Sequence, residues 1–320
     1  MKILVTGGSG YIGSVLCHIL SKNKISFAIL DNLSNSNKKY IPKKTNFYFG
    51  SIQNKRILNK IYRNFNPTHI IHLAASIDVN ESERKKDKYF KNNLTNSKIF
   101  LDFFISKGVK NIFFSSTAAV YSYSNNLITE KSKTSPVNYY GKTKLLIENF
   151  LLQKKKKNNF NLKIFRFFNV IGTEENLKAG NTSKRSKHLF NSICYSIINS
   201  EEFIINGSNY NTLDGTCVRD FIDVQDLTKI IFFFLKNNNI IKEDVFNLGI
   251  NKGYSVLNTI KKFETILKVK INYKVGSKRK GDIPKLICSN KRLKKYYNSK
   301  FINLRTTIRN HFKFYKNLKI

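Results

Sequence analysis

The chain opens with MKILVTGGSGYIG, residues 1–13, in which an apolar run at residues 3–5 leads into three glycines spaced G-x-x-G-x-x-G. Gly7, Gly10 and Gly13 allow a tight turn with positive φ, let a phosphate approach the backbone, and bring a helix close to the strand. Helical spacing of apolar residues follows, at Ile12, Val15, Leu16, Ile19 and Leu20. The stretch therefore predicts a strand, a turn and a helix that bind a dinucleotide.

A second apolar strand over residues 26–30 ends at Asp31. An acid at this distance from the glycine turn is placed to bind the adenosine ribose hydroxyls of a dinucleotide. The alternative is an ordinary strand-to-helix turn with a surface Asp, and the combined pattern disfavours it.

Strand and helix patterns alternate through the first half of the chain. Strands are predicted at residues 46–49, 69–73 and 111–114, and helices at 54–65 and 88–107. The alternation predicts an α/β fold, a Rossmann-like doubly wound parallel sheet covered on both faces. Ligands of such folds bind at the carboxyl ends of the strands, where the glycine turn, Asp31, Ala74, Ala75 and residues 115–117 fall.

Tyr140 and Lys144 are four residues apart in a predicted helix that runs through Phe150 and therefore share one helical face. A phenol is a poor base near neutral pH, but a fixed ammonium and a cationic ring beside it favour the phenolate. Such pairs are common on surface helices. This one gains weight from the dinucleotide turn and the Ser-Ser-Thr strand end before it.

Composition limits the class of protein. The 320 residues carry 57 Lys and Arg against 20 Asp and Glu, a formal charge of +37. Such a charge attracts nucleic acids and anionic membranes nonspecifically. Lysines are nevertheless spread along the chain, with one compact run at residues 154–157, so drift of the whole composition is the favoured explanation. No apolar stretch approaches the ~20 residues that span a bilayer.

Two further features bear on the cellular setting. The chain begins directly in a strand without a leader segment, which predicts a cytoplasmic protein. Cys17, Cys194, Cys217 and Cys288 are widely scattered and lack metal-ligand spacing, so we interpret them as free thiols and expect no metal site.

Longer motifs carry a family resemblance. The first half contains GGSGYIG, DNLSNS, SSTAAVY and YYGKTK, and the second half contains RFFNVIG at 166–172, DGTCVRDFIDVQDL at 214–227, FNLG at 246–249, GYSV at 253–256 and RKGD at 279–282. In order and spacing they resemble the UDP-glucose 4-epimerase family of the extended short-chain dehydrogenases/reductases, from residue 1 to about residue 290. The DGTxVRD stretch is the most specific of them.

The resemblance implies an enzyme that holds NAD and inverts C4 of a UDP-hexose, interconverting UDP-glucose and UDP-galactose through a transient 4-keto sugar. Tyr140 would be the base and then the acid. Lys144 would lower the pKa of Tyr140 and hold the nicotinamide ribose. Thr117 would hydrogen-bond the reacting hydroxyl.

The resemblance also assigns the remaining site residues. On the cofactor side it implies Gly7, Gly10, Tyr11, Ile12, Gly13, Asp31, Asn32, Ser51, Ile52, Leu73, Ala74, Ala75, Asn93, Ser115, Tyr140, Lys144 and Phe168. On the UDP-sugar side it implies Thr117, Asn169, His188, Leu189, Arg219, Arg279 and Asp282. Guanidinium forks suit a diphosphate, although without the resemblance either Arg would be taken for a surface charge.

Some positions depart from the family pattern. Ser51 stands where an Asp commonly contacts adenine, and Asp223 replaces a frequent His. Leu286 falls where some members have a Tyr that narrows the sugar pocket. A smaller residue there would admit a 2-N-acetyl group, so a UDP-N-acetylglucosamine 4-epimerase is an open alternative.

We expect an NAD-binding domain at residues 1–172 with a return segment near 214–248, and a UDP-sugar-binding domain at 173–320. The second domain is predicted to contain helices at 188–199 and 255–267, a strand at 202–206, and a C-terminal helix from Lys291 with a solvated basic face. The resemblance implies a homodimer through the helices containing Phe100 and Tyr140. From the spread of charge and the lack of a long apolar run we expect no specific nucleic acid and no membrane as partner.

Two alternative functions are compatible with parts of the sequence. The first is another nucleotide-sugar-modifying enzyme, such as a 4,6-dehydratase or a decarboxylase. A dehydratase needs an additional acid/base pair, which Ala118 and Ala119 after Thr117 cannot supply. A catalytically inactive, NAD-occupied scaffold on nucleic acid is the other, and the presence of Tyr140, Lys144 and Thr117 disfavours it.

Overall fold

A computed structural model describes residues 1–182, 188–279 and 281–318 and divides into two compact units. Unit 1 comprises Met1–Ser122, Ser132–Phe167 and Thr228–Phe246, and unit 2 comprises Tyr123–Lys131, Phe168–Leu227 and Asn247–Ile320. The return to unit 1 therefore begins at Thr228, later than the expected residue 214. The reason is that β9 (Val218–Asp223) pairs with strands of unit 2.

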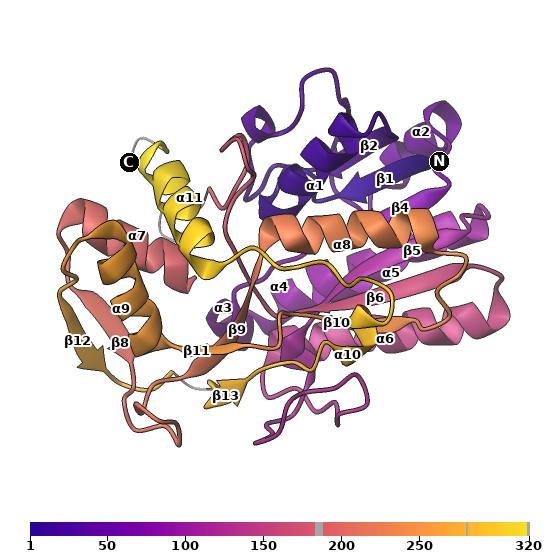
Figure 1. Cartoon of the computed structure of the whole chain (residues 1–320). Coiled ribbons are helices and arrows are strands. Elements are labelled where there is room, and N and C mark those ends of the chain that lie inside the picture. Colours follow the sequence, from indigo (N-terminus) through magenta and orange to yellow (C-terminus); the bar gives the residue numbers. More distant parts are fainter. Residues whose placement is uncertain (183–187, 280, 319–320) are drawn as a thin grey trace. The chain divides into compact units, whose positions relative to one another are not determined.

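Unit 1 is built on a seven-stranded sheet of order β10-β6-β5-β4-β1-β2-β3 (Figure 1). The strands are β1 (Lys2–Thr6), β2 (Ser26–Asp31), β3 (Asn46–Phe49), β4 (His69–His72), β5 (Asn111–Thr117), β6 (Asn161–Phe167) and β10 (Val245–Leu248). Every pairing among β1 to β6 is parallel. The predicted α/β, doubly wound fold is confirmed, and the strand order reverses direction between β1 and β4, where such sheets bind ligands.

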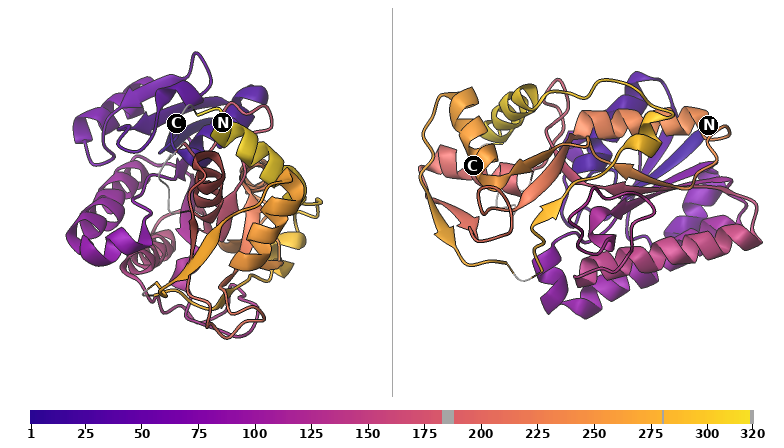
Figure 2. Two further views of the ribbon diagram at one scale, coloured as in Figure 1. Left: turned by 90° about the vertical axis from the view of Figure 1, so that its left-hand side faces the viewer. Right: turned by 60° about the horizontal axis from the view of Figure 1, so that its bottom comes forward.

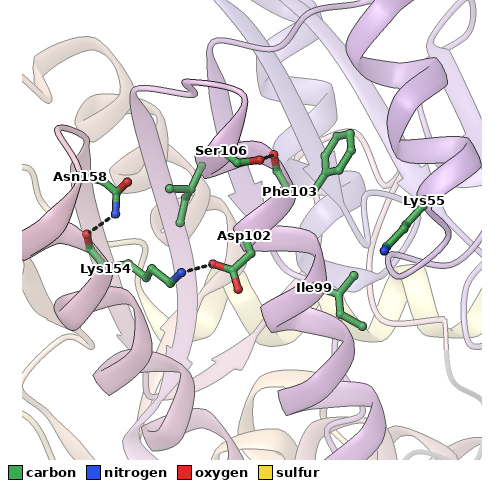
Figure 3. Close-up of a pocket in the computed structure, with 8 residues that line it drawn as sticks. Lys55, Ile99, Asp102, Phe103, Ser106, Lys154 and Asn158 are labelled. Atoms are coloured by element: carbon green, nitrogen blue, oxygen red, sulfur yellow. Dashed lines mark hydrogen bonds and ion pairs between the residues drawn. The ribbon is translucent and has the colours of Figure 1, made fainter.

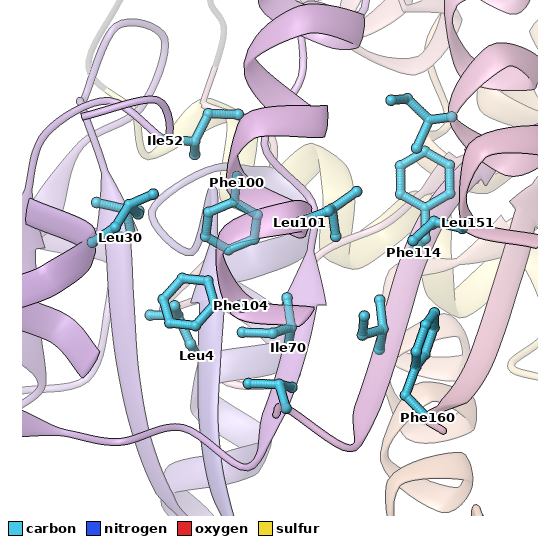
Figure 4. Close-up of a cluster of buried hydrophobic side chains, with 14 of the residues drawn as sticks. Leu4, Leu30, Ile52, Ile70, Phe100, Leu101, Phe104, Phe114, Leu151 and Phe160 are labelled. Atoms are coloured by element: carbon cyan, nitrogen blue, oxygen red, sulfur yellow. The ribbon is translucent and has the colours of Figure 1, made fainter. Parts of the chain in front are cut away.

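Helices cover both faces of this sheet (Figure 2). They include α1 (Tyr11–Lys22), α2 (Lys55–Asn64), α5 (Asn96–Ser106), α6 (Tyr139–Lys157) and α8 (Val224–Asn237). On one face, α2, α5 and α6 pack on the strands through a cluster that contains Leu4, Ile70, Phe100, Phe104 and Leu151 (Figure 4). On the other, the ring of Phe165 from β6 meets Phe234 of α8 at 5.2 Å between centroids.

The helix predicted over residues 88–107 is interrupted. After α3 (Val79–Arg84), the chain forms α4 (Lys86–Tyr89), a π-helical segment η2 (Phe90–Thr95), and then α5. A π turn admits an extra residue and is often found at functional sites. Periodicity alone could not indicate it, because the apolar face continues on both sides. Two short 3-10 segments, η1 (Lys38–Tyr40) and η3 (Ala118–Val120), complete this unit.

Unit 2 contains two small sheets. In one, β9 pairs with β7 (Asn169–Ile171), β11 (Gly253–Ser255) and β13 (Lys285–Leu286), and in the other, β8 (Phe203–Asn206) pairs in parallel with β12 (Tyr273–Gly276). Its helices are α7 (Leu189–Asn199), α9 (Val256–Leu267), α10 (Lys291–Lys294) and α11 (Leu304–Lys316). Phe190, Phe263 and Ile308 join three of these helices in one core.

The C-terminal helix α11 carries basic residues, as expected, but it also has a buried face. It buries Ile308, His311, Phe314 and Tyr315. The His311 ring lies between the backbone of Gly172 and the amide oxygen of Asn191, 3.0 Å from Nε2. The helix is therefore part of the core of unit 2.

The described residues also bear on the predictions about cysteines, metal sites and membrane-spanning helices. All four cysteines are buried and free, as predicted. Among the described residues, no group of three or more His, Cys, Asp or Glu side chains is arranged to hold a metal ion. None of their helices has the length and apolarity required to cross a membrane.

Candidate active site

The glycine turn after β1 packs closely on the start of α1. A Cβ on Gly13 would lie 2.2 Å from the carbonyl oxygen of Gly7, so only glycine permits this approach. Tyr11 and Ile12 begin α1 beside the turn. The Ser9 hydroxyl is buried without a hydrogen-bond partner among the described residues. Sequence reasoning missed Ser9, although its position inside the turn was a signal for it.

The predicted adenosine-side residues come together at the ends of β2 and β3. Asp31 is buried, and its carboxylate accepts hydrogen bonds from the backbone N–H of Ser9 at 3.0 Å and of Leu33 at 2.8 Å. Asn32 donates to the Ser51 hydroxyl at 3.4 Å, and Ile52 is buried next to it. The turn and the acid are thus linked directly, as their spacing suggested.

A buried polar chain supports the end of β4, where Leu73, Ala74 and Ala75 follow. The Ala74 N–H donates to Thr6 Oγ1 at 3.3 Å, and the same oxygen is hydrogen-bonded to His72 Nδ1 at 2.7 Å. The opposite nitrogen, Nε2, is hydrogen-bonded to the Ser97 hydroxyl at 2.9 Å. Burial and then the Lys144 charge lower the pKa of His72 to about 3, so the ring is neutral.

Asn93 is held by both ends of its amide. Its Oδ1 accepts from the Ser76 N–H at 2.8 Å, and its Nδ2 donates to the Ser76 carbonyl at 2.9 Å. The π-helical segment η2 places Asn93 there. Ser115 is fixed as well, because its hydroxyl donates to the His72 carbonyl at 2.9 Å. Ser76 was not recognised from the sequence, since a single Ser after two alanines has no distinctive pattern.

Three caps hold the first turn of α6, which carries Tyr140. The Asn138 side chain accepts from the Gly141 N–H at 2.8 Å. From α3, Glu83 accepts from the Tyr139 N–H at 2.6 Å and Ser82 accepts from the Tyr140 N–H at 3.1 Å. The start of the helix is therefore fixed by side chains as well as by packing.

Gly141 brings this turn against the residues that follow β5. A Cβ at that position would lie 2.2 Å from the Ala119 carbonyl oxygen. The close approach places Tyr140 beside Thr117, whose side chain hydrogen-bonds the phenol. Two segments far apart in the sequence are joined in this way.

The charges of the Tyr140 and Lys144 pair differ from the expectation. Burial raises the pKa of Tyr140 to about 12, against the opposing effect of the Thr117 hydrogen bond. Burial also lowers the pKa of Lys144 to about 7, against the opposing charge of Glu148. Lys144 is therefore not among the groups that set the pKa of Tyr140 in the protein alone, where burial is the main cause.

Lys144 is 3% exposed, and its ammonium lies 4.7 Å from the centroid of the Phe114 ring. Among the described residues, none accepts a hydrogen bond from it. A nearly buried lysine whose ammonium lies beside an aromatic ring leaves that ammonium available to a polar ligand.

In unit 2, Arg219 lies next to the turn that contains Arg279 and Asp282. Arg219 donates from Nη1 to the Ile283 carbonyl at 2.8 Å and from Nη2 to Asp282 Oδ1 at 3.4 Å. The Asp282 N–H donates to the Arg279 carbonyl at 3.2 Å. Lys280, the remaining non-glycine residue of the RKGD motif, lies outside the described residues.

The other predicted substrate residues lie on different elements of unit 2. Asn169 begins β7 directly after the buried Phe168, while His188 and Leu189 lie at the start of α7. Leu286 is buried on β13, where it pairs with Arg219 of β9. Its partner across the sheet is therefore Arg219, one of the residues proposed to bind the diphosphate.

Comparison with known proteins gives consistent results. The family model described as "NAD dependent epimerase/dehydratase family" matches residues 3–249. The UDP-glucose 4-epimerase of Lactobacillus helveticus is 36% identical over 290 residues, which are 90% of this chain and 88% of the relative.

Solved structures agree over the whole length. UDP-glucose 4-epimerase from Bifidobacterium longum, crystallised with NAD+ and UDP, matches with a TM-score of 0.92 and 27% identity, covering 100% of this chain and 99% of that one. The UDP-Glc/GlcNAc 4-epimerase from Campylobacter jejuni matches with a TM-score of 0.84 and 29% identity, covering 99% of both chains.

Proposed function

The chain belongs to the NAD-dependent epimerase/dehydratase family, and from this premise we infer that it is a UDP-glucose 4-epimerase, inverting C4 of the hexose through a transient 4-keto sugar. One observation carries the proposal: Tyr140, hydrogen-bonded to Thr117, and Lys144 lie on one face of α6 at the carboxyl edge of the parallel sheet. The substrate pair UDP-glucose and UDP-galactose would place the enzyme in galactose metabolism.

The residues of unit 1 fit NAD. The glycine turn leaves room for the diphosphate, the Ser9 hydroxyl has no hydrogen-bond partner among the described residues, and Asp31 presents a buried carboxylate. The Lys144 ammonium without an acceptor fits the ribose hydroxyls next to the nicotinamide. When bound, NAD would supply the redox chemistry, the reversible transfer of hydride at C4 of the sugar.

Tyr140 and its neighbours handle the proton. The Tyr140 Oη takes the proton of the sugar 4-hydroxyl and later returns it, while Thr117 orients that hydroxyl. The raised pKa of Tyr140 means that the protein alone keeps the phenol protonated at neutral pH. A cationic ring held beside Tyr140 would favour the phenolate, the form in which Tyr140 acts as the base.

The substrate unit would bind the UDP part. Arg219 and Arg279 offer guanidinium groups to the diphosphate, with Asp282 holding the first of them in place. Asn169, His188 and Leu189 are proposed to contact the rest of the nucleotide sugar. Binding energy from these groups, remote from C4, positions the reacting carbon.

A second substrate is supported by one residue. Leu286 is smaller than the Tyr found in some members of the family, and the Campylobacter relative is described as acting on both plain and N-acetylated sugars. We therefore keep UDP-N-acetylglucosamine as the alternative substrate. Ala118 and Ala119 form η3 directly after Thr117 and offer no further acid or base, which argues against a dehydratase.

The experiment is product analysis with the purified chain. UDP-galactose, UDP-glucose and their two N-acetylated counterparts are each incubated with the protein, after its bound nucleotide has been extracted and identified. We expect NAD in the extract and conversion of the plain pair, with Tyr140→Phe as the inactive control. Inactivity of the wild-type protein on all four sugars would refute the proposal.

We further propose that two copies pair through the outward faces of α5 and α6. A pocket of about 520 Å³ opens there, lined by Ile99, Phe103 and the ion pair between Asp102 and Lys154 at 2.6 Å (Figure 3). Phe103 is only partly buried in it. Sedimentation of the wild type and of Phe103→Asp tests this, and equal monomer masses would refute it.

The cellular setting is also a proposal. Four buried cysteines without a disulfide fit a reducing compartment such as the cytoplasm. Localisation of a tagged full-length chain tests it.

A further inference from the structure

A buried ion pair lies one helical turn beyond Lys144. Glu148 and Arg166 are 1% and 6% exposed. Arg166 donates to the Glu148 carboxylate from Nε at 3.0 Å and from Nη2 at 2.6 Å, a bidentate arrangement. None of the residues proposed to act in catalysis or binding is a member of this pair.

The pair is fixed from four elements. Glu148 also accepts a hydrogen bond from the Ser116 hydroxyl, and Arg166 donates from Nη1 to the Tyr121 hydroxyl at 2.8 Å while its guanidinium lies 4.8 Å from the Tyr121 ring centroid. These contacts therefore join four elements next to Lys144 and Thr117: α6, β5, β6 and the segment after η3. Ser116 immediately precedes Thr117, so the same contacts restrain that residue.

Glu148 is spaced to act on Lys144. Tyr140, Lys144 and Glu148 follow one another at intervals of four on α6, which places them along one helical face. Lys144 and Glu148 are both buried, and Glu148 is the charged residue whose field raises the pKa of Lys144. His72 faces Lys144 from β4, but its low pKa keeps it neutral, and Phe114 from β5 offers only its ring.

We propose that Glu148, clamped by Arg166 and Ser116, is a fixed negative charge that supports the Lys144 ammonium from one helical turn away. The proposal rests on the role of Lys144 given above. It explains why a buried ion pair is retained at a place where an apolar pair would fold equally well. A Lys144 that lost its proton would no longer favour the Tyr140 phenolate. The Glu148–Arg166 pair therefore supports Tyr140 indirectly, through Lys144.

The test is a ¹³C NMR titration of the lysine side chains in the full-length protein, with Lys144→Met used to assign the Lys144 signal. We expect Glu148→Gln to move the Lys144 titration to lower pH by about one unit, because an opposite charge at close range has been removed. Because the proposal requires a charged Lys144, the alkaline limb of the kcat profile moves to lower pH by a similar amount, about tenfold in rate at a pH above it.

Lys163 provides a matched control in the same spectra. It is also buried, donates to the Ile241 carbonyl at 2.9 Å, and has a pKa lowered to about 8 by burial, with Asp244 opposing. Glu148→Gln leaves the Lys163 titration in place. Asp244→Asn lowers the Lys163 titration and leaves Lys144 unchanged.

Glu148→Gln leaves the Arg166 charge buried and can prevent folding. The double variant Glu148→Gln with Arg166→Met removes both charges together and is expected to lower the Lys144 titration as well. Glu148→Asp, which keeps the charge, restores the wild-type titration in part. An unmoved Lys144 titration in the folded double variant overturns the proposal.

The two proposals fail separately. The lysine titration needs no substrate, so it decides the role of Glu148 whatever the turnover assay gives. Absence of turnover in the wild-type protein refutes the proposed function instead.

Discussion

The candidate residues of the two units are held in different ways. In unit 1, Asp31, Asn93 and Ser115 are themselves buried, and both ends of the Asn93 amide are bound. In unit 2, Arg219 is held by a carbonyl and by Asp282, whose side chain is 31% exposed. Positions fixed by buried contacts suit a permanently held cofactor and proton transfer, whereas partly exposed ones suit a substrate that enters and leaves.

If this contrast is correct, substitutions in unit 1 act on kcat and substitutions in unit 2 act on KM. The largest effect is expected at Tyr140. Tyr140→Phe removes the group that carries the proton and lowers kcat about 10³-fold, with little change in KM, in a coupled assay for UDP-glucose formation. Tyr139→Phe is the matched control, since that hydroxyl is outside the proposed site. Equal loss in both variants would contradict the assignment.

The next effect is expected at Arg219. Arg219→Lys keeps the charge but loses the planar fork, so we expect KM for UDP-galactose to rise about 100-fold while kcat changes much less. Arg292→Lys, in the same unit but paired with Glu130, is the control and leaves KM unchanged. A fall in kcat alone for Arg219→Lys would break the contrast between the units.

The two units differ in how their candidate site residues are held, but their hydrophobic cores share one feature. Each unit contains a buried neutral histidine, His72 in unit 1 and His311 in unit 2. Burial is the main cause that lowers the pKa of His311 to about 4, with a smaller contribution from the charge of His188, while the bond to Gly172 opposes both. The unfolded chain binds the proton near pH 6.5, so this stability is present at pH 7 and is lost as the pH falls toward 4.

The corresponding test is urea unfolding at pH 7 and pH 5. We expect the wild type to lose about 2 kcal/mol more than His311→Gln over this interval, the amount that follows from a pKa of about 4 against 6.5. The difference between the two proteins removes the contributions of other groups. Parallel losses in both would show that His311 titrates normally.

The smallest effect compares two helix caps. Asn138 caps α6 in unit 1 and Asn303 caps α11 in unit 2, each accepting from a backbone N–H at 2.8 and 2.9 Å. Replacing either with Ala costs about 1 kcal/mol of unfolding free energy. Only Asn138→Ala is expected to lower kcat as well, because α6 carries Tyr140. Unchanged turnover in that variant would show that Glu83 and Ser82 suffice to hold the turn.

The sequence by itself determined the fold class and the glycine turn, and it predicted Asp31 and the Tyr140 and Lys144 pair as site residues. These depend on short spacings, such as the period of four on a helix or the residue that follows a strand, which local backbone geometry converts directly into position. The family motifs extended this to Arg219, Arg279 and Asp282.

Only the tertiary structure decided the rest. The π turn at Asn93, the partners Ser76 and Glu148, the role of α11 and the boundary at Thr228 depend on contacts between residues far apart in the chain. The same holds for charge: the pKa values of Tyr140 and Lys144 are set by how much water the fold removes, and burial is a property of packing that no spacing in the sequence encodes.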